Sequence, residues 1–144
     1  MTTRVLLPDR ELDALAAEKV MGWKVVDTGE FRPRQFFRVV NDKGEPLTLS
    51  HYSAERAKER AYPSFTESLD AALLLVEALR AKGWTISLLL VGDAWHWQFW
   101  RIGPDGVGED ANSDDLVLAR SITIAALLAV GASPYGGEEA RDGS

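Results

Sequence analysis

The residues best suited to chemistry lie in FRPRQFFR, residues 31–38, where basic and aromatic side chains are interleaved. Arg32, Arg34 and Arg38 each carry a planar guanidinium group that can bind a phosphate or a carboxylate through paired hydrogen bonds. One interpretation is an anion-binding site for a phosphorylated ligand or an acidic partner. The other, equally supported, is that charges along an edge strand discourage pairing with a second sheet.

A second candidate group lies in AWHWQFWRI, residues 94–102, which holds three of the five tryptophans. Trp95 and Trp97 can stack on a planar ligand such as a nucleotide base if they are exposed. We favour the alternative, in which Trp95, Trp97 and Phe99 form one layer of the core under a helix. His96 points to the opposite face, where it can carry a proton or bind a ligand.

No catalytic set accompanies these candidates. His96 has no acid or nucleophile at a telling distance, so we assign no catalytic residue and expect a protein that is not an enzyme. The alternative is a small hydrolase in which His96 works with an acid of residues 109–115. The acids of that segment are Glu109, Asp110, Asp114 and Asp115. Their spacing is not that of a calcium loop, and solvation or helix capping explains them better.

The composition excludes several kinds of site. The chain has no cysteine, which excludes disulfides and thiolate metal sites, and its two histidines, His51 and His96, are far apart in the sequence. We therefore expect neither a metal nor a cofactor. The 22 acidic and 16 basic residues give a net charge of −6, which disfavours nucleic-acid binding because that needs a basic surface.

The N-terminal segment, MTTRVLLPDRELD, has an apolar run of only three residues, which is too short for a signal peptide. No later segment approaches the length of a membrane span. These patterns predict a protein of the cytoplasm that does not enter a membrane.

Hydrophobic periodicity predicts three main helices, over residues 9–20, 66–82 and 113–130. Alternating or β-branched runs predict strands over residues 23–27, 35–40, 85–91, 94–102 and 107–111. Ser53 is expected to cap a short exposed helix, Thr66 the second main helix, and Ser113 or Asp114 the last one. Because short turns require antiparallel neighbours, we predict an α+β fold, an α/β/α sandwich with a mainly antiparallel sheet and helices on both faces.

Three segments carry a resemblance to a known family, namely residues 11–25, residues 65–79 and the WQFW strand with residues 118–132. They resemble the phage ABA-sandwich domain family, small proteins of phage and prophage genomes. Residues 18–23, EKVMGW, match its first helix well, whereas Phe65 and Thr66 stand where tyrosine and serine are usual. The resemblance implies a sandwich fold and a phage origin, and it implies no activity and no catalytic residue.

The resemblance also suggests the domain organisation. Residues 41–61 lie outside the match and look like an insertion in a single domain of residues 1–131. Residues 132–144 are rich in glycine and charge, which predicts a disordered tail.

These observations together predict a phage or prophage accessory protein that acts by binding. The partner would be a host protein or a small phosphorylated ligand. The alternatives are the small hydrolase and an assembly protein that forms homo-oligomers through exposed sheet edges.

Overall fold

The computed structural model describes residues 5–29 and 34–136. In chain order its elements are α1 (Asp9–Leu15), the π-helical segment η1 (Ala16–Val20), β1 (Lys24–Asp27), β2 (Phe37–Val40), α2 (Ala54–Ala61), α3 (Leu69–Arg80), β3 (Thr85–Val91), β4 (Ala94–Ile102), β5 (Gly108–Asp115) and α4 (Leu118–Ala129). Helices combined with two antiparallel sheets confirm the predicted α+β class.

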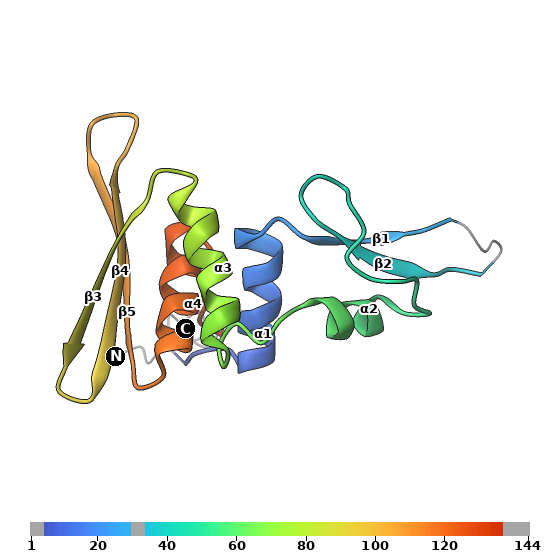
Figure 1. The fold of residues 1–144 in the computed structure, drawn as a ribbon, viewed down its shortest axis with the longest axis horizontal. Helices are drawn as coiled ribbons and strands as arrows, with labels where there is room; N and C mark the ends of the chain where they lie inside the picture. Colours follow the sequence, from blue (N-terminus) through green and yellow to red (C-terminus); the bar gives the residue numbers. More distant parts are fainter. Residues whose placement is uncertain (1–4, 30–33, 137–144) are drawn as a thin grey trace, which may run out of the picture.

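The elements are stacked along one long axis (Figure 1). The three-stranded sheet, in the order β3–β4–β5, forms the first end, which we call the sheet end. Helix α4 packs on this sheet, and α3 and α1 pack on α4. The β1–β2 hairpin and α2 form the opposite end, which we call the hairpin end. The buried core lies mainly between the helices and the inner face of the sheet; its larger members include Leu12, Phe65, Leu75, Leu79, Ile122 and Leu127.

The inner face of the three-stranded sheet carries large rings against α4. Trp97 and Phe99 are buried there, with ring centroids 5.9 Å apart in an edge-to-face arrangement. Ile86 and Ala111 are the direct partners of Phe99 on the two neighbouring strands, so they share its face. This layer confirms the interpretation that these rings fill the core under a helix.

The outer face of the same sheet differs from the predicted sandwich. Among the described residues, the helices pack on the inner face alone, and the outer face keeps Leu89, Trp100 and Ile102 exposed. The physical reason lies in β4, where the inward rings of Trp97 and Phe99 alternate with the polar outward Gln98, and in β5, whose outward residues such as Asp110 are polar. That alternation is typical of an antiparallel sheet covered on one side.

Strand β5 is longer than predicted, and α4 therefore begins later. Ser113 and Asp114, expected to cap the last helix, are strand residues paired with Trp97 and His96. Asp115 partly replaces the expected cap, because its Oδ1 accepts a hydrogen bond of 2.8 Å from the amide of Val117, just before α4.

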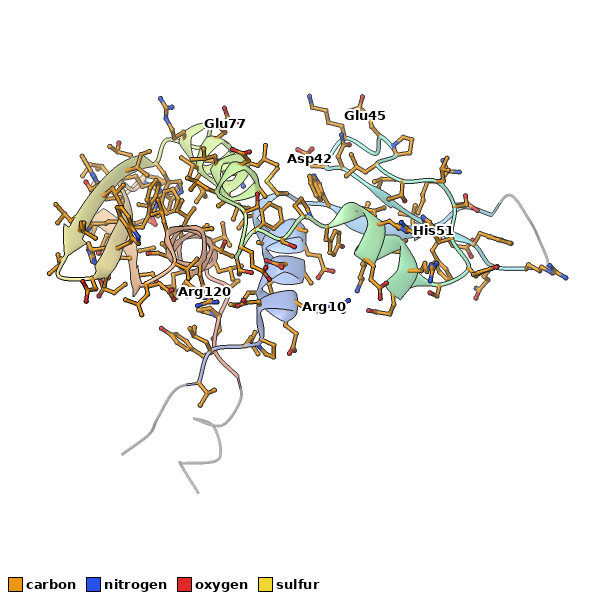
Figure 2. The ribbon with its side chains drawn as sticks, turned by 60° about the horizontal axis from the view of Figure 1, so that its bottom comes forward. Arg10, Asp42, Glu45, His51, Glu77 and Arg120 are labelled. Atoms are coloured by element: carbon orange, nitrogen blue, oxygen red, sulfur yellow. The ribbon has the colours of Figure 1, made fainter. Side chains whose placement is uncertain are left out.

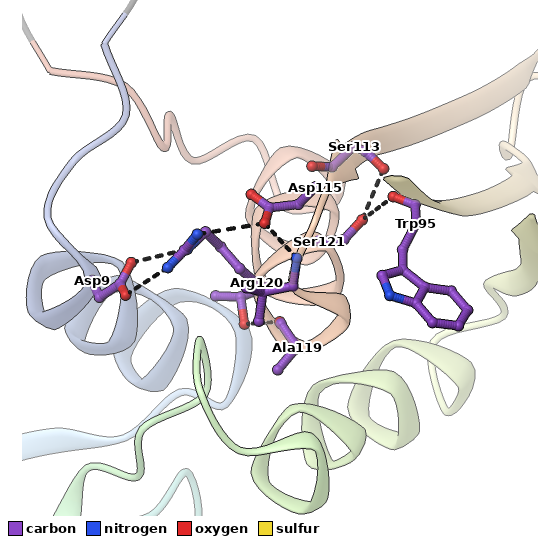
Figure 3. Close-up of polar contacts among 9 residues, drawn as sticks. Asp9, Trp95, Ser113, Asp115, Ala119, Arg120 and Ser121 are labelled. Carbon is purple, nitrogen blue, oxygen red and sulfur yellow. Dashed lines mark hydrogen bonds and ion pairs between the residues drawn. The ribbon is translucent and has the colours of Figure 1, made fainter. Parts of the chain in front are cut away.

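Two side chains in the first turn of α4 tie it to the elements on either side (Figure 3). Arg120 donates two hydrogen bonds, of 3.1 and 3.0 Å, to the carboxylate of Asp9 in α1. The hydroxyl of Ser121 lies 2.8 Å from the carbonyl oxygen of Ser113 and 3.2 Å from that of Trp95. Helix α4 is thus the element that joins the sheet to α1.

The start of α3 also differs from the prediction. The cap is Ser68, whose Oγ accepts a hydrogen bond of 3.2 Å from the amide of Ala71, and the prediction of Thr66 as the cap is wrong. Thr66 is fully buried instead, and its amide donates to Oδ1 of Asp13 in α1 at 2.9 Å. This contact holds the segment before α3 against α1.

Residues 41–61, predicted as an insertion, build much of the hairpin end. After β2 the chain folds back, and Phe37 and His51 exchange two backbone hydrogen bonds of 2.7 Å. Ser53 caps α2 as predicted, because its Oγ accepts a 3.1 Å hydrogen bond from the amide of Arg56. Helix α2 then packs on both strands of the hairpin.

The two ends of the described chain lie together. Leu6 forms a β-bridge with Tyr135, and the amide of Leu7 donates to the carbonyl oxygen of Pro134 at 2.9 Å. Residues 132–136 are thus held by the N-terminal segment, which shortens the predicted tail, and residues 137–144 lie outside the described part. No described helix has the length and apolar character needed to cross a membrane.

Candidate anion-binding site

The structure separates the two predicted groups of site residues. Arg34 and Arg38 belong to the hairpin end, whereas Trp95, His96 and Trp97 belong to β4 at the sheet end (Figure 1). Arg32 lies outside the described residues. No single site can therefore contain both groups.

Trp97 is unsuited to the predicted stacking on a ligand, because it is buried under α4. Trp95 lies on the same face and is half-buried, with its backbone carbonyl oxygen accepting from Ser121. The prediction that Trp97 binds a ligand is corrected, because burial of this large ring stabilises the core, and the half-buried Trp95 is left without a second open ring beside it on β4.

His96 lies on the opposite face of the sheet, as predicted, and its ring contacts the carboxylate of an acidic residue. Its Nδ1 lies 2.5 Å from Oδ1 of Asp114, the directly opposite residue on β5. Within the described residues, however, no hydroxyl group hydrogen-bonds to His96, so this pair has no nucleophile to activate. The contact resembles a cross-strand ion pair more than a catalytic dyad.

A basic and aromatic cavity lies at the hairpin end. It has a volume of about 220 Å³ and is lined by Phe36, Ser50, His51, Tyr52, Arg56 and Arg60, which we call the arginine pocket. Figure 2 shows His51 beside α2, on the opposite side of α1 from Arg120. The lining comes from three parts of the chain: the start of β2, the segment that pairs with it, and α2.

Helix geometry explains why Arg56 and Arg60 line the same cavity. Arg56 and Arg60 are four residues apart on α2, and residues at this spacing lie on one face of a helix. Two like charges at this spacing destabilise a helix by about 0.2–0.5 kcal/mol. The buried Ala57 on the same helix fixes its orientation, so both arginines remain exposed beside the cavity.

The acids of α2 are directed elsewhere. Glu59 pairs with Arg10 of α1 at 3.5 Å, across the groove between α1 and α2. Glu55 pairs with Lys58 of its own helix at 3.8 Å, and Lys58 also lies 3.6 Å from Glu18 of η1. In the described part of the chain, neither Arg56 nor Arg60 forms an ion pair. Helix α2 therefore presents mixed, paired charges to α1 and unpaired positive charge to the arginine pocket.

The strand side of the pocket is held by hydrogen bonds. Nη2 of Arg38 donates to Oγ of Ser50 at 3.4 Å, and the backbone of His51 is paired with Phe37. The rings of Phe36 and Tyr52 lie with centroids 6.1 Å apart, and Tyr52 is 80% exposed. An exposed ring beside two guanidinium groups can receive a planar group attached to an anion.

The predicted arginine stretch lies near the arginine pocket but supplies none of its basic lining residues. Arg38 contacts the lining through Ser50, and Arg34 is exposed without lining the pocket. The sequence interpretation took residues 53–61 as a solvated helix and missed Arg56 and Arg60. The available signal was their spacing of four, which places two like charges on one face.

A larger groove of about 730 Å³ lies between α1 and α2, lined by both acids and bases such as Asp13, Glu55 and Lys58. Several of its charges are already paired with one another, so it offers no single charge to a ligand. The described residues contain no group of three or more histidines and acids that could hold a metal ion.

Comparison of the chain with protein-family models, with curated proteins and with solved structures found no match. The arginine pocket and the physical chemistry of its residues are therefore what indicate a function.

Proposed function

We propose that this chain is a binding module without catalytic activity, and that the arginine pocket holds the phosphate of a small phosphorylated ligand. The observation that carries the proposal is the pair Arg56 and Arg60, which face a cavity and lack acidic partners among the described residues. In a chain of net charge −6, where acids outnumber bases, such a pair is a local exception that suits an anion.

The size of the pocket restricts the ligand. Its volume of about 220 Å³ lies below the range of roughly 300–1,000 Å³ that holds drug-sized ligands. A phosphate group fits inside, and the exposed ring of Tyr52 at the rim can stack on a planar group. We therefore propose a nucleoside monophosphate or a compound of similar chemistry as the ligand class.

The test is isothermal titration calorimetry of the chain with adenosine monophosphate, with adenosine and with inorganic phosphate. We expect the monophosphate to bind and adenosine to bind at least about 10-fold more weakly, because a hydrogen bond to a charged group contributes roughly 1.5–3 kcal/mol. Binding should also weaken at high salt, since the arginines are exposed.

Variants separate the two parts of the proposed site. Arg56→Gln and Arg60→Gln should each weaken monophosphate binding at least about 10-fold, whereas Tyr52→Ala should weaken monophosphate binding and leave inorganic phosphate unaffected. Arg80→Gln, an exposed arginine of α3, is the matched control and should bind as the unchanged chain does. Absence of binding by the unchanged chain, or equal loss in the control, would contradict the proposal.

A small hydrolase remains the second candidate because of one observation, the contact of 2.5 Å between His96 and Asp114. We would test it with His96→Ala against any ester or phosphate-ester turnover of the unchanged chain. Wild-type turnover in that variant would remove this candidate. The proposed phage origin rests on the sequence resemblance alone and adds no residue to either site.

A further inference from the structure

The two edges of the three-stranded sheet differ in charge. The described strand order leaves β3 and β5 at the edges. Strand β5, GEDANSDD, carries four acids, whereas β3, TISLLLV, has no charged residue at all. Because like charges that face each other destabilise strand pairing, β5 resists pairing with a copy of itself and β3 does not.

Strand β3 also lacks the features by which proteins protect an edge. It pairs with β4 through seven consecutive residues without a bulge, and it contains no proline and no lysine. Its apolar side chains are exposed on both faces: Leu88, Leu89, Leu90 and Val91 are 43%, 58%, 59% and 64% exposed. An uncharged, regular and apolar edge of this kind is a template for a further strand.

We propose that two copies of this chain pair antiparallel through β3, about a two-fold axis at Leu88, and so form one continuous six-stranded sheet. A second copy is the occupant because its own β3 edge is equally free of charge, whereas both chains carry a net charge of −6 elsewhere. Pairing at β3 also places the two acidic β5 strands at the outer margins of the joined sheet, as far apart as the sheet allows.

The register follows from the turn between β3 and β4. Gly92 and Asp93 form a two-residue loop, with Gly92 at φ 60° as in a type II′ turn. The residues that flank such a turn, Val91 and Ala94, form a hydrogen-bonded pair, and hydrogen-bonded pairs alternate along antiparallel strands.

Counting back along β3, the residues hydrogen-bonded to β4 are then Val91, Leu89 and Ser87. The amides and carbonyls of Leu90, Leu88 and Ile86 therefore point to the free edge. Opposing Leu88 with Leu88 of a second copy brings Ile86 opposite Leu90. This register pairs the free donors and acceptors and places apolar side chains side by side.

The experiment is sedimentation of the full chain over a range of concentrations, compared with the monomer mass of 15.9 kDa. We expect a dimer of the unchanged chain. Leu88→Lys places two positive charges against each other at the proposed axis and should weaken dimerisation at least 10-fold. An equimolar mixture of Leu88→Lys and Leu88→Glu should restore a dimer, which a general loss of folding would not allow.

Ile102→Lys is the matched control, because Ile102 is exposed on the outer face of β4 and away from the β3 edge. This variant should dimerise as the unchanged chain does, and circular dichroism should show that every variant is folded. A monomer at all concentrations, or a dimer lost in Ile102→Lys and kept in Leu88→Lys, would overturn the proposal. Neither outcome bears on ligand binding by the arginine pocket.

Discussion

The sheet end and the hairpin end use their strands for different purposes. At the sheet end, β4 directs Trp97 and Phe99 into the core against α4, and its polar residues His96 and Gln98 remain on the outer face. At the hairpin end, β1 and β2 have four residues each, and they bury only small apolar side chains such as Val39 beside a charged cavity.

This difference separates stability from binding. A two-stranded hairpin is marginal by itself in water, so the hairpin end depends on α2 and on the segment that folds back onto β2. Charges there are exposed and cost little, whereas the sheet end buries large apolar surface and contributes more to stability. Substitutions at the sheet end should therefore change the free energy of unfolding, and substitutions in the arginine pocket should change the affinity for the ligand.

The largest expected effect is at the sheet end. Trp97→Ala should destabilise the chain by about 3–5 kcal/mol, because it removes a buried ring and leaves a cavity under α4. Trp100→Ala, on the exposed face of the same strand, should cost far less. Urea unfolding of both variants measures the difference, and equal costs would contradict the assignment of inner and outer faces.

A smaller effect is expected at the junction of α4 and α1. Arg120→Lys keeps the positive charge and loses the paired hydrogen bonds to Asp9, which should cost about 1 kcal/mol in this partly exposed pair. The cost should appear in the unfolding of the whole chain, since this pair joins the sheet end to α1. Unchanged stability would show that the pair of Arg120 and Asp9 does not stabilise the contact between α4 and α1.

The buried Asp13, which joins α1 to the segment before α3, should make the stability of the chain sensitive to pH. Burial raises the pKa of Asp13 above its ordinary value of 3.8. Between 3.8 and the raised value, the folded chain keeps a proton that the unfolded chain has lost, so the free energy of unfolding falls as the pH rises. Asp13→Asn still accepts from the Thr66 amide and should remove this fall, as urea unfolding at a series of pH values would show.

The smallest expected effect is in the arginine pocket. Arg60→Gln removes a like charge four residues from Arg56 and should stabilise the chain by about 0.2–0.5 kcal/mol in the absence of ligand. Thermal unfolding at low ionic strength measures this change. A loss of stability instead would indicate that Arg60 packs on the hairpin. Stability and ligand binding would then not be separated between the two ends.

Much of the fold was predictable because it depends on local pattern. The strands β3 and β4 have the predicted bounds, and Ser53 caps α2 as predicted. Ser113 was misassigned because a short polar residue is typical of a helix cap, whereas here it is a buried strand residue on the inner face, opposite Trp97. The partnership of His96 with Asp114 was not predictable from pattern, because it is set by the register between β4 and β5. The uncovered outer face was missed because β3 is apolar on both faces, although the outward residues of β5 are polar.

By itself the sequence determined the alternation along β4, the amphipathic helices, and a basic and aromatic stretch in an acidic chain. Only the tertiary structure decided that the other sheet face stays uncovered and which arginines share a cavity. The reason is that local pattern acts between neighbours in the chain, whereas the arginine pocket joins β2, its returning partner segment and α2. Their contacts are made by long-range packing, which no single stretch of residues encodes.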